Sequence, residues 1–83
     1  MSAGNVTSDT GASAAKTELE EGIKALQGGD VEGARTHLTA AQEAMTNSPP
    51  DAIRHFEEGM KAFDSGDNNA AIMHLNITNE ALG

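Results

Sequence analysis

Apolar residues recur every three or four positions through most of this chain, with polar residues between them. Leu19, Ile23 and Leu26 belong to one such series, and Ala34 and Leu38 belong to the next. This spacing is typical of an amphipathic α-helix, in which residues three or four apart lie on one face. No segment alternates between apolar and polar residues over enough positions to predict a β-strand. We therefore expect an all-α protein.

The chain contains an internal repeat with an offset of 37 residues. Residues 19–45 align with residues 56–82, and 12 of the 27 aligned pairs are identical. One structural unit is therefore used twice, at about residues 14–46 and 51–83. The positions of the first unit whose residue recurs 37 positions later are Glu20, Glu21, Gly22, Lys24, Ala25, Gly29, Asp30, Ala34, His37, Leu38, Glu43 and Ala44.

Each unit is predicted to form two helices joined by a tight turn. Gly29 and Gly66 can adopt the left-handed conformation that ends a helix. The residues that follow them, Asp30 and Asp67, can accept hydrogen bonds from the free amides at the start of the next helix. The prolines at 49–50 prevent the second helix from continuing and favour a new helix start.

The expected fold is an up-down-up-down antiparallel bundle of four helices, because such short turns force consecutive helices to run antiparallel. Small residues such as Gly22 and Gly59 predict close helix packing inside each hairpin, with the larger side chains meeting between hairpins. Residues 1–12 have the composition of a flexible tail, so the bundle should span residues 13–83. The expected helices lie near 13–27, 31–46, 50–64 and 68–82.

The charge and composition exclude several classes of function. The chain has 13 Asp and Glu against 5 Lys and Arg, a net charge of −8, so its surface repels nucleic acid. It has no cysteine, and therefore no thiolate ligand or nucleophile. No apolar run approaches the roughly 20 residues of a membrane span, and this form shows no signal peptide. We also expect no enzyme, because no arrangement of nucleophile, base and oxyanion donors is visible.

The candidate chemistry lies on three histidines. Four polar residues each come one position before an inward-facing residue, which at about 100° per residue places them on the same flank of their helices. They are Glu18, His37, His55 and His74. His55 lies 11 residues before Gly66 and His74 lies 8 residues after it, so their heights differ by only about 4–5 Å. Side chains on matching flanks of two neighbouring antiparallel helices point into the same groove between those helices. We therefore expect His55 to meet His74, and Glu18 to meet His37.

Two imidazoles beside carboxylates are a donor set for a divalent transition metal such as copper, nickel or zinc. Asp51 lies one turn before His55 and is the candidate third ligand, whereas Glu58 lies three residues after it and points further toward solvent. Glu18 and His37 would form a second, poorer site. The alternative is that all of these are partly exposed polar residues at the edge of the core. The chain lacks the H-E-x-x-H and paired E-x-x-H patterns of tight zinc or di-iron sites.

The segment 52–59, with the turn at 66–67 and His74-Leu75 after it, resembles the repeat of the small metal-binding protein (SmbP) family. Its members are small secreted or periplasmic four-helix bundles, built of A-x-x-H-x-x-E type helices joined by glycine turns. The resemblance covers residues 14–83 and implies storage or scavenging of divalent metals, copper above all. This chain has fewer histidines than that family, so we expect a lower capacity. The positions that the resemblance implies as ligands are His37, His55 and His74.

Each unit also resembles a tetratricopeptide repeat in the spacing of its small and leucine residues, such as Gly22, Ala34 and Leu38. That resemblance implies a helical scaffold for protein or peptide binding. Only two units are present, whereas such arrays use three or more. The aromatic positions of the motif are filled here by Ala25 and Ala62.

The last predicted helix carries a second apolar strip on the side away from Leu75. A strip of this kind is typical of a homodimer or protein-partner surface. Its members are Ala70, Met73, Ile77 and Ala81.

The sequence thus predicts a small acidic non-enzymatic protein that binds divalent transition metals weakly to moderately through histidines and carboxylates. Storage or scavenging is the expected role, and the SmbP resemblance implies a periplasmic or secreted location. The alternative is a tetratricopeptide-like interaction module, or a small homodimeric bundle without metal.

Overall fold

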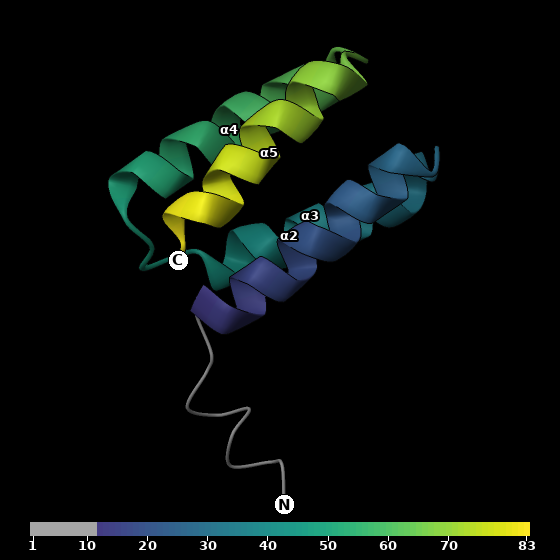
Figure 1. Ribbon diagram of the computed structural model, residues 1–83. Helices are drawn as coiled ribbons and strands as arrows, with labels where there is room; N and C mark the ends of the chain where they lie inside the picture. The colour runs from purple at the N-terminus through teal and green to yellow at the C-terminus, as the bar shows by residue number, and fades with distance from the viewer. Residues whose placement is uncertain (1–11) are drawn as a thin grey trace, which may run out of the picture.

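The computed structural model describes residues 12–83 and consists of four helices (Figure 1). They are α2 (Ala12–Gln27), α3 (Val31–Ala44), α4 (Pro50–Asp64) and α5 (Asn68–Ala81). No strand occurs in this range, so the all-α four-helix prediction is confirmed. Every helix bound lies within two residues of its expected place. Except for Ala12, which begins α2, the expected tail lies outside the described residues.

The two hairpin turns are built alike, as the repeat requires. Gly29 and Gly66 have φ angles of 82° and 85°, in the left-handed region that suits glycine. The carboxylate of Asp30 then accepts a hydrogen bond from the amide three residues later at 2.9 Å, and Asp67 does the same at 3.1 Å. Each turn therefore reverses the chain within three residues, and the helices of each hairpin run antiparallel.

Helical glycines bring the two helices of each hairpin close together. A Cβ atom placed on Gly22 would lie 2.7 Å from Cδ2 of Leu38, and one placed on Gly59 would lie 3.0 Å from Cδ2 of Leu75. Both leucines are fully buried. The close approach agrees with the sequence, but these two large side chains cover a glycine of their own hairpin as well as contributing to the common core.

Helices α2 and α5 join the two hairpins. Lys16 Nζ donates to the side-chain oxygen of Asn79 at 2.9 Å and to its backbone oxygen at 3.2 Å. The side-chain amide of Asn79 also donates to Glu20 at 3.4 Å. Helices α3 and α4 touch each other far less, and the ribbons of the hairpins separate toward their turns (Figure 1). The two hairpins therefore contact each other where α2 meets α5 and stay apart where α3 faces α4.

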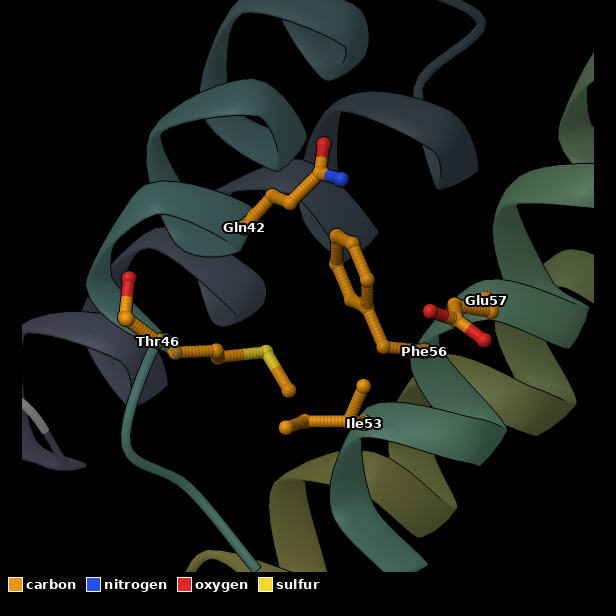
Figure 2. Close-up of a pocket in the computed structure, with 6 residues that line it drawn as sticks. Gln42, Thr46, Ile53, Phe56 and Glu57 are labelled. Carbon is orange, nitrogen blue, oxygen red and sulfur yellow. The ribbon is translucent and has the colours of Figure 1, made fainter. Parts of the chain in front are cut away.

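An open pocket of about 130 Å³ marks the loose side, between α3 and α4. Phe56 and Ile53 project from α4 toward α3, with the polar ends of Gln42 and Glu57 around them (Figure 2). The remaining lining comes from Met45 and Thr46. The core thus reaches the surface at this end of the hairpins. None of the helices within residues 12–83 combines the length and hydrophobicity of a membrane span.

Candidate functional site

His55 on α4 and His74 on α5 face each other across the second hairpin. Their ring centroids are 5.9 Å apart and their planes differ by 25°, so the two imidazoles stack. Both side chains are partly exposed at the edge of the core. The structure therefore brings together the two histidines that the flank and height of their helices place side by side.

A glycine makes room for each cross-hairpin pair. Gly59 lies one turn after His55, and a Cβ atom placed there would be 3.4 Å from Cβ of His74. Because α4 carries no side chain at this point, α5 comes close enough for the rings to meet. Gly22 does the same in the first hairpin, at 3.6 Å from Cβ of His37. The sequence signal is a glycine four residues after the first member of each pair, which by itself indicates only close helix packing.

The Nδ1 atoms of His55 and His74 are both buried and have no hydrogen-bond partner among the described residues. A buried polar atom that makes no hydrogen bond costs about 1–3 kcal/mol of folding free energy. The pair is therefore not explained as a stabilising contact of the core. Imidazole nitrogens are, however, ligands that suit copper, nickel and zinc in proteins, and a buried Nδ1 can become such a ligand once its ring turns.

The equivalent pair of the first hairpin is satisfied internally. His37 Nδ1 donates to Glu18 Oε1 at 2.8 Å, and these side chains are 39% and 34% exposed. Glu18 and His55 occupy equivalent positions of the two units, as do His37 and His74. The residue at this one position of the repeat, Glu18 or His55, thus decides whether the pair forms an internal hydrogen bond or leaves two Nδ1 atoms without one. The first hairpin has less to gain from a metal ion.

The two other candidate ligands stay apart from the histidine pair. Asp51 accepts a hydrogen bond from Arg54 at 2.6 Å on an exposed face of α4. Glu58 is exposed. Within residues 12–83, no three His, Asp or Glu side chains converge in a way that could hold a metal ion. The described part of the chain therefore offers the pair His55 and His74 without a third protein ligand.

The stacked rings must turn before one ion can bind both of them. A metal lies near the plane of each imidazole ligand, about 2.0–2.1 Å from the ligand nitrogen. Two planes only 25° apart, on rings 5.9 Å apart, meet far beyond that distance. The bond between Cβ and the ring is soft, because its torsion is broad and roughly two-fold. A common ion therefore requires rotation about this bond in these partly exposed side chains.

The apolar strip of α5 lies next to this pair. Met73 is 54% exposed and Ile77 is 36% exposed, with Ala81 exposed and Ala70 partly buried. This places the strip on the outer surface of the second hairpin. These four residues, Ala70, Met73, Ile77 and Ala81, form the α5 strip.

The chain matches no known family, and no curated protein or solved structure is detectably similar to it. The functional argument therefore rests on the geometry and chemistry of the histidine pair and on the surface beside it.

Proposed function

We propose that this chain is a small, acidic, non-enzymatic protein that binds divalent copper, nickel or zinc ions weakly to moderately, for storage or scavenging. The observation that carries this proposal is the stacked pair His55 and His74, whose Nδ1 atoms are buried without hydrogen bonds. Coordination of a metal would offset the cost of holding these nitrogens unpaired.

Three further features support a metal-binding role. The net charge of −8 attracts cations to the surface. Two ligands from one chain leave the other coordination positions open to water or to a second chain, which suits an ion that must be released again. The resemblance of the repeat to the SmbP family agrees with the same role and with a periplasmic or secreted location. Glu18 and His37 would serve as a weaker second site once their hydrogen bond opens.

The test is a titration of the full chain with Cu(II), Ni(II) and Zn(II), followed by calorimetry and by amide NMR spectra. We expect the signals of His55 and His74 to shift or broaden first. His74→Gln should abolish this binding, and His37→Gln, the matched change in the other unit, should preserve it. An unresponsive wild-type spectrum, or equal losses in the two variants, would overturn the proposal.

A second candidate function is protein interaction without metal, by the tetratricopeptide-like units or as a homodimer. The observation that favours it is the exposure of Met73 and Ile77 on α5. Sedimentation at rising protein concentration, in the presence of a chelator, tests it directly. A dimer or a complex under these conditions would support the interaction module, and a monomer at all concentrations would count against self-association.

A further inference from the structure

The histidine pair and the α5 strip form one continuous surface. At about 100° per residue, His74 lies only about 20° from Ala81 and 40° from Ala70 around the axis of α5. Ile77 follows His74 by one turn and is exposed. Any molecule that covers the strip therefore also approaches the edge of the histidine pair.

Helix α5 is the least charged helix of a strongly acidic chain. Glu80 is the one Asp, Glu, Lys or Arg among its 14 residues, whereas the whole chain has a net charge of −8. Two copies of this chain repel each other over most of their surfaces. Of the four helices, α5 presents the fewest charges to a second copy.

The pair also has too few ligands for the ion that it suits. A tetrahedral divalent ion such as zinc takes four ligands. The described residues of one copy supply two imidazoles and no carboxylate close enough to join them. A second copy of the same pair would supply the other two.

Symmetry places the two pairs together if the strips pack. In a two-fold dimer the same patch is used on both partners, and antiparallel helices present equal flanks to one side. The strip runs from 70 to 81, so His74 lies about 2 Å along the axis from its centre. The two copies of His74 would then differ in height by only about 4–5 Å, on the same side of the contact.

We propose that a tetrahedral divalent ion bridges two copies of this chain, with His55 and His74 of each copy as its four ligands and the two α5 strips in contact. This inference rests on the proposed metal-binding function. A strip of four residues, two of them alanine, cannot by itself reach the roughly 1,000 Å² of a stable interface. The dimer therefore depends on the ion.

The test measures mass and stoichiometry together on the full chain, by light scattering and calorimetry with Zn(II). We expect a monomer of 8.6 kDa with chelator and a doubling of mass with zinc, at one zinc ion per two chains. His74→Gln should prevent both zinc binding and the doubling. His37→Gln should prevent neither.

A surface substitution separates bridging from binding. Ile77→Lys puts a charge in the strip without adding a carboxylate beside His74, so this variant should still bind zinc but remain a monomer. Val31→Lys is the matched control, because Val31 is 48% exposed on α3, outside the strip. It should dimerise as the wild type does.

Each other result overturns a distinct claim. One zinc ion bound per monomer would overturn the bridge and leave the proposed metal binding standing. A dimer that forms in chelator would overturn its dependence on the ion. The absence of zinc binding in the wild type would overturn the zinc bridge, and the absence of copper and nickel binding as well would overturn the proposed function.

Discussion

Replacing His55 by glutamate would copy the pair of the first hairpin into the second. Glu18 holds the equivalent position and accepts a hydrogen bond from His37 at 2.8 Å. In His55→Glu the new carboxylate can accept from His74 in the same way. One of the two unpaired Nδ1 atoms is deleted and the other gains a partner.

The expected gain in stability follows from the contacts that change. Each unpaired nitrogen costs about 1 kcal/mol, the lower end of the usual range, because the rings are partly exposed. The new hydrogen bond adds about 0.5 kcal/mol, and the lost ring stacking costs about 1 kcal/mol. The variant should thus be more stable by about 1.5 kcal/mol, which raises Tm by about 6–12 °C in a domain of this size.

Urea unfolding followed by circular dichroism measures this change, with an unchanged slope as the sign that the folded state is intact. The same variant should bind metal more weakly, because its pair then matches the weaker site of Glu18 and His37. The reciprocal change, Glu18→His, should lower stability by a similar amount and create a second histidine pair that binds metal. The reasoning is refuted if His55→Glu is less stable than the wild type, or if it binds metal with unchanged affinity.

Three further predictions concern the packing, a helix cap and pH. Gly22→Ala should lower the free energy of unfolding by about 1–2 kcal/mol, because its Cβ would lie 2.7 Å from Leu38, whereas Gly59→Ala, at 3.0 Å, should change it by less than about 1 kcal/mol; equal effects in denaturant unfolding would contradict this. Asp67→Ala removes the acceptor for the amide of Ala70 and should cost about 1 kcal/mol, so an unchanged urea midpoint would show that the cap contributes nothing. Metal affinity measured by calorimetry should fall steeply on acidification, because a protonated imidazole cannot bind a metal, and an affinity that stays constant between about pH 8 and pH 5 would exclude histidine ligands.

The helix bounds could be predicted almost to the residue because their signals are local. Gly29 and Gly66 stop a helix by their own backbone conformation, and the aspartate after each one caps the next helix. The predicted end of α3, at residue 46, lies two residues beyond the observed end at Ala44. There the amide of Met45 bonds to the oxygen three residues back rather than four, and no glycine marks the change.

The meeting of His55 with His74 could be predicted because both helices leave the same short turn, which fixes their relative height. The separation of Asp51 from the pair could not. Helical angle places Asp51 near His55, but its side chain lies on the exposed face of α4 and bonds to Arg54. The stacking of the rings and the burial of their Nδ1 atoms depend on side-chain torsions, for which the sequence carries no signal.

The pocket beside Phe56 also could not be predicted from the sequence. It depends on how the two hairpins dock, and α3 and α4 stay apart while α2 and α5 touch. Docking of one hairpin on another is decided by long-range contacts, which no turn or cap encodes.

The two three-residue turns also bear on how fast the chain reaches its native state. Most helix contacts join segments that are close in sequence, and proteins with such low contact order fold within microseconds to milliseconds. The bond between Lys16 and Asn79 is different, since its partners are 63 positions apart. Closing so long a loop carries the larger entropy cost. Each hairpin should therefore fold early, and the contact between α2 and α5 should form last.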